Sequence, residues 1–156
     1  FKDYIKSVLA NAKILSETLK NNGFKIYSGG TDTHLMLVDL RPFNVKGNLA
    51  AESLSRANIT CNKNGIPFDS ESPMITSGIR LGSQAATTRG FGLKEFEKVG
   101  ELITKVIDGL SKNPNDNSKI EDEVRKEVVS LCSSFPIYKN LRKWFAQYAK
   151  KEKLQL

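Results

Sequence analysis

Two long stretches of the chain carry apolar residues at helical spacing, and each apolar stripe needs an apolar partner. Residues 3–21 and 93–110 both repeat apolar side chains at steps of three and four, which is typical of amphipathic helices. Gly23 closes the first pattern. The stripes consist of Tyr4, Ile5, Val8, Leu9, Ala12, Leu15 and Leu19, and of Phe96, Val99, Leu102, Ile103, Val106, Ile107 and Leu110.

Short apolar runs lie between and beside these two stretches. The run 34–40 is apolar on nearly both sides, which is typical of a strand in the middle of a covered sheet. The expected fold is therefore α/β, in two α+β layers, with a small, mostly antiparallel sheet and helices packed on one face. The other expected strands are 24–28, 59–62 and 75–81, and the other expected helical segments are 48–58, 83–86, 118–133 and 137–151.

Arg80 stands out because it lies between apolar neighbours in the strand expected at 75–81. We expect its guanidinium to be half-buried, and a half-buried guanidinium needs a planar anion, which a carboxylate supplies bidentately. That carboxylate belongs either to a ligand or to an Asp or Glu of the same domain, and the residues alone leave both open.

A loop rich in turn-forming residues is expected at 62–73, where Pro67, Asp69 and Pro73 disfavour regular structure. The side-chain amide of Asn64 can both donate and accept hydrogen bonds, so it could recognise the edge of a heterocycle. The alternative is that Asn64 only caps a turn.

Composition sets limits on the protein class. The 156 residues suffice for one domain with a core, and no apolar run approaches the length of a membrane span. His34 is the only histidine and Cys61 and Cys132 lie far apart, so no metal constellation is apparent, and a reducing, cytoplasmic compartment is expected. His34 itself is expected to be a hydrogen-bonded residue at the start of a strand.

The formal charge of +7 is concentrated near the C-terminus, where residues 137–156 contain six lysines and arginines but only one acidic residue, Glu152. We expect a solvated helix face there, with contact to nucleic acid or an acidic membrane as the alternative. The chain opens on Phe1 inside a helical pattern, without an initiator Met or signal peptide, so a piece of a longer protein is expected. No nucleotide-binding, serine-hydrolase or zinc-protease motif is present.

Four blocks, in order, resemble the C-terminal part of serine hydroxymethyltransferase. They are S-G-G-T-D-T-H-L-M-L-V-D-L at 28–40, N-K-N-G-I-P at 62–67, S-P-M-I-T-S-G-I-R-L-G at 72–82 and T-T-R-G-F at 87–91. The resemblance covers roughly residues 1–138. It implies a linker helix at 1–22 and, at 23–138, the small C-terminal domain of a fold-type I pyridoxal phosphate enzyme. The basic amphipathic tail at 139–156 has no counterpart.

The resemblance also implies roles for individual residues. Arg80 would bind the substrate carboxylate, and Asn64, Ser72, Pro73 and Met74 would contact tetrahydrofolate, with Met74 standing where Phe is usual. No residue of this chain is implied to be catalytic, since the lysine that holds pyridoxal phosphate and most other cofactor ligands belong to the large domain.

The implied activity is the reversible conversion of serine and tetrahydrofolate into glycine and 5,10-methylenetetrahydrofolate by a cytoplasmic homodimer. The isolated chain would be inactive, its partners being serine or glycine, tetrahydrofolate and the rest of the parent chain, with no membrane and no expected nucleic acid. Two alternatives stay open: the small domain of another fold-type I enzyme such as an aminotransferase, or a stand-alone module that binds through the basic tail.

Overall fold

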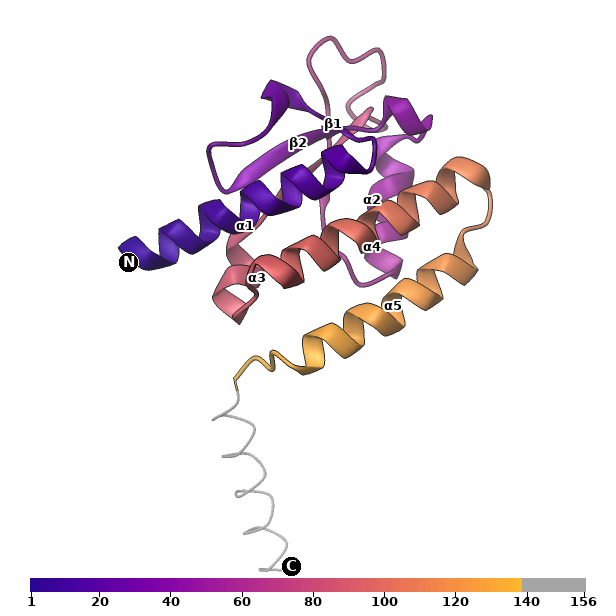
Figure 1. Cartoon of the computed structure of the whole chain (residues 1–156). Helices are drawn as coiled ribbons and strands as arrows, with labels where there is room; N and C mark the ends of the chain where they lie inside the picture. Colours follow the sequence, from indigo (N-terminus) through magenta and orange to yellow (C-terminus); the bar gives the residue numbers. More distant parts are fainter. Residues whose placement is uncertain (139–156) are drawn as a thin grey trace, which may run out of the picture.

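A computed structural model describes residues 1–138 of the chain as two layers, a four-stranded sheet and a layer of helices (Figure 1). All three strand pairings are antiparallel. The expected α+β architecture is thus confirmed. In the order β1-β2-β4-β3, the strands are β1 (Lys25–Ile26), β2 (Leu35–Asp39), β4 (Gly78–Gly82) and β3 (Asn62–Asn64).

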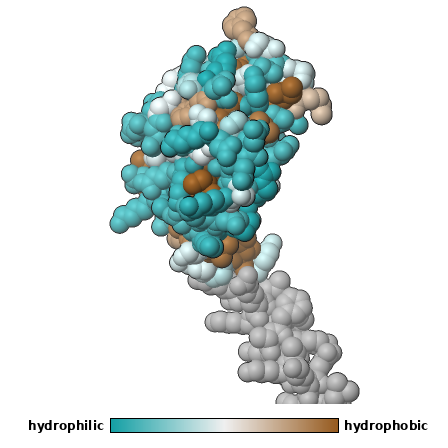
Figure 2. Space-filling model, turned by 90° about the vertical axis from the view of Figure 1, so that its right-hand side faces the viewer, coloured by the Kyte–Doolittle hydropathy of each residue, from teal (hydrophilic) through white to brown (hydrophobic). Residues whose placement is uncertain are grey.

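The helices match the sequence pattern closely. α1 (Lys2–Asn21) and α4 (Leu93–Lys112) pack side by side, and α4 also contacts α2 (Gly47–Arg56) and α5 (Ser118–Ser133). Their apolar stripes meet the buried face of the sheet in one core, which includes Leu15, Leu19, Met36, Val38, Ile79, Phe96, Ile103 and Ile107. The face in Figure 2 is mostly hydrophilic, as expected when the apolar side chains are gathered inside.

The boundaries of the short elements differ from the expectation. The strand expected at 24–28 is only β1, because the chain turns at once into the 3₁₀ segment η1 (Tyr27–Gly29), where Ser28 has a left-handed φ of 63°. A second 3₁₀ segment, η2 (Arg41–Phe43), follows β2. The helical turn expected at 83–86 extends into α3 (Gln84–Arg89). The tail at 139–156 and most of the helix expected at 137–151 lie outside the described residues.

A buried polar cluster joins α5 to α2. The carboxylate of Glu121, only 4% exposed, accepts hydrogen bonds from Ser53 at 2.6 Å and from two nitrogens of Arg56, each at 2.7 Å. Asn117 completes the cluster by donating to the Ser53 hydroxyl and to the Val106 carbonyl. The hydrogen bonds from Arg56 lower the pKa of Glu121, burial opposes them, and Ser53 adds to the lowering.

Glu121→Gln is expected to destabilise the fold by about 1–2 kcal/mol, because it removes a charge from strong, largely buried hydrogen bonds without changing the side-chain volume. Urea denaturation of the chain would measure the loss. The matched control is Glu123→Gln on the same helix, because the Glu123 side chain is 43% exposed and pairs with Lys105. We expect the control to lose less than about 0.5 kcal/mol. Equal losses would contradict the special role of the buried cluster.

Candidate functional site

One face of the sheet is left open by the described residues. Along β2, Met36 and Val38 point into the core, whereas Leu35 is 37% exposed and Leu37 half-buried. The expectation of a covered strand is therefore wrong for residues 1–138: β2 is central, but helices cover only one of its faces. Period-two alternation explains the difference, since every second residue of this apolar run must face away from the helices.

Arg80 lies on this open face. It sits in the centre of β4, directly opposite Leu37 on β2 and Asn62 on β3. Its neighbours Ile79 and Leu81 are buried in the core, but Arg80 itself is exposed. The expected half-burial is therefore wrong, because the apolar neighbours occupy the opposite face of the sheet.

Within residues 1–138, the guanidinium of Arg80 has neither a salt bridge nor a side-chain hydrogen bond. Asp39 at the end of β2 is already engaged, because Arg41 donates to its carboxylate from Nε and Nη2 at 2.7–3.2 Å. Burial raises the pKa of Asp39, but the hydrogen bonds and charge of Arg41 bring it below its usual value. Arg80 is therefore free to bind an anion from outside the described residues.

Asn64 lies at the end of β3, opposite Gly78, so the loop expected from residue 62 begins only after this strand. Asn62 and Asn64 share a face because they are two residues apart, which puts Asn64 on the same open face as Arg80. Its amide nitrogen donates to the Gly65 carbonyl at 2.8 Å. That contact is the turn-capping role left open above, and it leaves the amide oxygen and one N–H for a ligand.

A cavity of about 320 Å³ lies beside Asn64, between the end of β3 and the loop that leads to β4. Asn64, Ser72 and Pro73 all line it, together with Lys63, Gly65, Asp69, Glu71 and Thr76. Met74 does not line it and is 73% exposed. Three of the four expected folate-contacting residues thus meet around one cavity, and the fourth lies outside it.

Asp69 organises the loop, a role that was not predicted from the sequence. Its carboxylate accepts four hydrogen bonds, from the backbone N–H groups of Ile66, Glu71 and Ser77 at 2.9–3.1 Å and from the Ser77 hydroxyl at 2.6 Å. Burial raises the pKa of Asp69, but these hydrogen bonds outweigh it and hold the pKa far below its usual range. A carboxylate that stays charged at neutral pH therefore fixes both ends of the loop.

The backbone of the loop adopts left-handed conformations at two residues that are not glycine. Phe68 has a φ of 57° with its side chain fully exposed, and the buried Thr76 has a φ of 62°. Such a conformation is unusual for a β-branched residue and costs about 1–3 kcal/mol. The surrounding contacts, including the Thr76 hydroxyl that donates to the Gly78 carbonyl at 3.1 Å, must hold it in place.

Gly78 sits where the loop, β2 and β3 converge. A β-carbon there would lie 2.5 Å from Ile66 Cγ2 and 2.7 Å from the Val38 carbonyl oxygen. Both distances are shorter than real contacts allow, and one of them is to backbone. Only glycine therefore fits between β2 and the loop.

Gly78→Ala is expected to cost about 1–3 kcal/mol of folding free energy, since the strands must move apart to admit the methyl group. Thermal unfolding would measure the cost. Gly65→Ala is the matched control in the same loop, because a β-carbon at residue 65 would meet only Asp69 Oδ2 at 3.9 Å. A Gly78→Ala protein as stable as the control would contradict the packing described here.

Comparison with known proteins decides the family. The sequence model of serine hydroxymethyltransferase matches residues 1–103. The chain belongs to the serine hydroxymethyltransferase family. The resemblance seen in the four sequence blocks is thereby confirmed.

Individual serine hydroxymethyltransferases match over nearly the whole described chain. The protein from Pelagibacter ubique (strain HTCC1062) is 89% identical over 142 residues, which is 91% of this chain and 33% of that protein. The protein from Marinomonas sp. (strain MWYL1) is 61% identical, covering 89% of the chain and 33% of that protein. The chain thus spans about a third of the length of the serine hydroxymethyltransferases that it matches.

The single histidine and the two cysteines noted in the sequence lie outside the candidate site. His34 is exposed, and its backbone carbonyl accepts a hydrogen bond from the Ser83 N–H just before β2. Cys61 and Cys132 are free thiols, and burial raises the pKa of Cys61 to about 11. Among residues 1–138, no three His, Cys, Asp or Glu side chains gather as a metal site, and no helix is long and apolar enough to span a membrane.

Proposed function

We propose that the intact protein containing this chain is a glycine hydroxymethyltransferase. It would reversibly convert serine and tetrahydrofolate into glycine and 5,10-methylenetetrahydrofolate, with pyridoxal phosphate as cofactor. The observation that carries the proposal is the guanidinium of Arg80, which has no partner within residues 1–138 and lies on the same open sheet face as Asn64 and its cavity. Family membership supports the reaction, and this arrangement supports a site for its two substrates.

Arg80 would bind the carboxylate of serine or glycine. A planar guanidinium matches a carboxylate with two parallel hydrogen bonds, which fixes the orientation of the amino acid as well as its position. Orientation decides which bond at the α-carbon reacts, so the contribution of Arg80 is one of alignment. A strand in the middle of the sheet is a rigid support for that task.

Pyridoxal phosphate, when bound, acts as the electron sink for the α-carbon of the amino acid. The open face offers one free guanidinium and side-chain amides, a donor set that suits a carboxylate and the edge of a heterocycle. It does not by itself form a site for the phosphate and ring of the cofactor. The chain would therefore act as one wall of a site whose cofactor is bound mainly by the large domain.

The cavity beside Asn64 would receive part of tetrahydrofolate. The free amide oxygen and N–H of Asn64 can pair with the donor and acceptor atoms of a pterin ring. Ser72 and Pro73 form another part of the cavity wall, and Asp69 keeps that wall in place. Met74 would serve as an apolar cover from outside the cavity, in place of an aromatic ring.

In the intact protein, we assign residues 1–22 to a linker helix, residues 23–138 to the small domain and residues 139–156 to a basic tail. Since α1 shares its core with α4, helix and small domain would move as one body. We also propose that the parent protein is a homodimer in the cytoplasm and that the chain alone is inactive.

The experiment that tests the function is an assay of the intact protein with serine and tetrahydrofolate, following the formation of glycine. We expect glycine only when both substrates and pyridoxal phosphate are present. An aminotransferase would instead consume the amino acid in the presence of a 2-oxo acid, without tetrahydrofolate. That second result would overturn the proposal, and so would an intact protein that performs neither reaction.

A further inference from the structure

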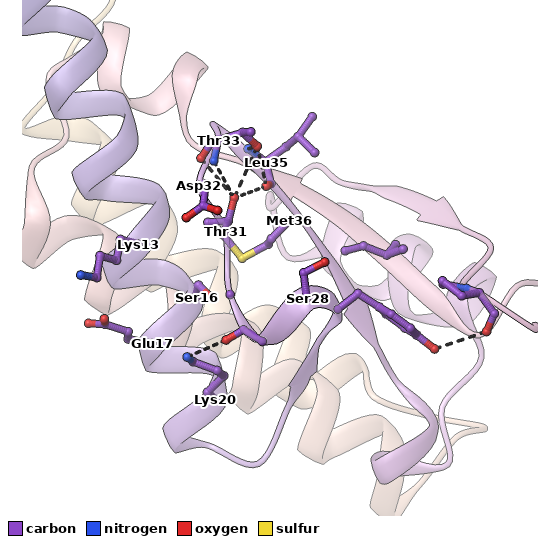
Figure 3. A pocket seen from close by; sticks show the side chains of 15 residues that line it. Lys13, Ser16, Glu17, Lys20, Ser28, Thr31, Asp32, Thr33, Leu35 and Met36 are labelled. Carbon is purple, nitrogen blue, oxygen red and sulfur yellow. Dashed lines mark hydrogen bonds between the residues drawn. The ribbon is translucent and has the colours of Figure 1, made fainter.

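A second cavity is larger than the one beside Asn64, and one of its lining residues, Leu37, lies directly opposite Arg80. It has a volume of about 730 Å³ and is lined by α1, the segment 27–33 and residues 35–37 of β2 (Figure 3). Neither Arg80 nor Asn64 lines it. A cavity of this size accommodates a small molecule together with several waters.

The charged residues around the cavity balance each other. Lys13, Glu17 and Lys20 line the cavity from α1, and Asp32 lines it from the segment 27–33 (Figure 3). Lys20 is engaged, since it donates to the Gly29 carbonyl at 2.9 Å. Within residues 1–138, the charged groups of Lys13, Glu17 and Asp32 form no salt bridge. The cavity thus presents an ammonium group and carboxylates that are both available to a ligand.

Ser16 supplies an independent sign that the cavity receives a polar group. It lines the cavity between Lys13 and Lys20, yet it is only 2% exposed, and its hydroxyl oxygen has no hydrogen-bond partner among the described residues. Buried hydroxyls are nearly always paired, so an unpaired one that borders a cavity marks the position of a missing partner. The space beside this oxygen is open, since a β-carbon built at Gly30 would still lie 4.0 Å from it.

We propose that this cavity binds a small zwitterion of the α-amino-acid class. Its carboxylate would lie between Lys13 and the hydroxyl of Ser16, and its ammonium group would lie near Glu17 and Asp32. A simple anion fits less well because it would meet two carboxylates, and a simple cation would meet two lysines. The site does not depend on the proposed function, although the proposed substrates belong to the same chemical class, so the experiment must separate the two sites.

Isothermal titration calorimetry of the intact protein with glycine separates the cavity from the proposed substrate site at Arg80. Arg80→Ala removes the proposed substrate contact but changes no residue that lines this cavity, and we expect the variant to retain one saturable glycine site. Adding Ser16→Ala to that variant should weaken the remaining site about tenfold, since the hydroxyl then no longer donates to the carboxylate. Acetate carries only the carboxylate of glycine and methylamine only its ammonium group, so each should bind at least about tenfold more weakly than glycine.

Stability provides a second readout that does not depend on binding. Because the Ser16 oxygen lacks a partner in the absence of a ligand, Ser16→Ala should leave the melting temperature unchanged or raise it. No saturable glycine binding in the Arg80→Ala protein would overturn the proposal, and so would equal affinity with and without Ser16. If both wild-type sites instead persist in the Arg80→Ala protein, the assignment of Arg80 fails and the cavity stands.

Discussion

Arg80→Ala in the intact protein is expected to weaken the binding of glycine and serine at the cofactor about hundredfold, because two charge-assisted hydrogen bonds are lost together. Pyridoxal phosphate should stay bound, since Arg80 is assigned to the amino acid and not to the cofactor. Titration with glycine, followed by the absorbance of the cofactor, measures this site alone and ignores glycine bound elsewhere.

Arg80→Lys sharpens the test. It keeps the positive charge but loses the planar, two-pronged geometry, so its affinity should fall between wild type and Arg80→Ala. Arg125→Ala is the matched control, because Arg125 is also an exposed arginine and, within residues 1–138, pairs only with Asp122 on the same helix. It should bind glycine normally. Wild-type affinity in Arg80→Ala would remove Arg80 from the substrate site.

Asp69→Ala should have the largest effect on the loop between β3 and β4. Three backbone N–H groups and the Ser77 hydroxyl lose their acceptor at once. We expect a loss of about 3 kcal/mol in stability, less than the sum of separate penalties because water can reach part of the loop. In the intact protein, the KM for tetrahydrofolate should rise while the affinity for glycine stays close to wild type.

The split between the two substrates is the decisive readout for Asp69. A general loss of folding would lower the amount of active protein without changing either binding constant in the remaining folded fraction. A selective rise in the KM for tetrahydrofolate indicates instead that the cavity wall has moved. Equal weakening of glycine and tetrahydrofolate would contradict the view that Asp69 positions the folate side of the site.

The pH dependence gives Asp69 a further signature. Its pKa is depressed in the folded chain, so the stabilisation is fully present above the unfolded value of about 3.9 and is lost as the pH falls below it. Asp69→Asn keeps an acceptor oxygen but cannot titrate. Denaturation curves between pH 3 and pH 7 should therefore show less acid destabilisation in this variant than in wild type. If wild type and Asp69→Asn lost the same stability as the pH falls, the role assigned to the Asp69 charge would be contradicted.

The sequence predicted the long helices well, because α1 and α4 each carry an apolar stripe over about five turns. Short strands were predicted less well. β1 has two residues and β3 has the polar sequence N-K-N, so neither shows the alternation that marks a strand, and both exist only through pairing with β2 and β4. Tertiary contacts of this kind leave no local signal.

The residues of the candidate site were also predicted only in part from the sequence. Arg80 was found because an arginine among apolar strand residues is conspicuous, but its exposure was misjudged because the neighbours revealed only the other face. Asp69 was overlooked as an organiser. Its partners Ile66, Glu71 and Ser77 are near in sequence, and an Asp before Ser in a turn-rich stretch is a signal for such capping. The number of bonds that meet at one carboxylate appears only in three dimensions.

The four hydrogen bonds at Asp69 also bear on the thermodynamics of recognition. Much of the freedom of the 65–77 segment is already lost when the chain folds, so an incoming pterin would find its wall in place and would not have to order it. The unfavourable conformational entropy of association should then be small. Calorimetry would register this as a more favourable entropy for wild type than for an Asp69→Ala protein, whose loop must be ordered by the ligand itself.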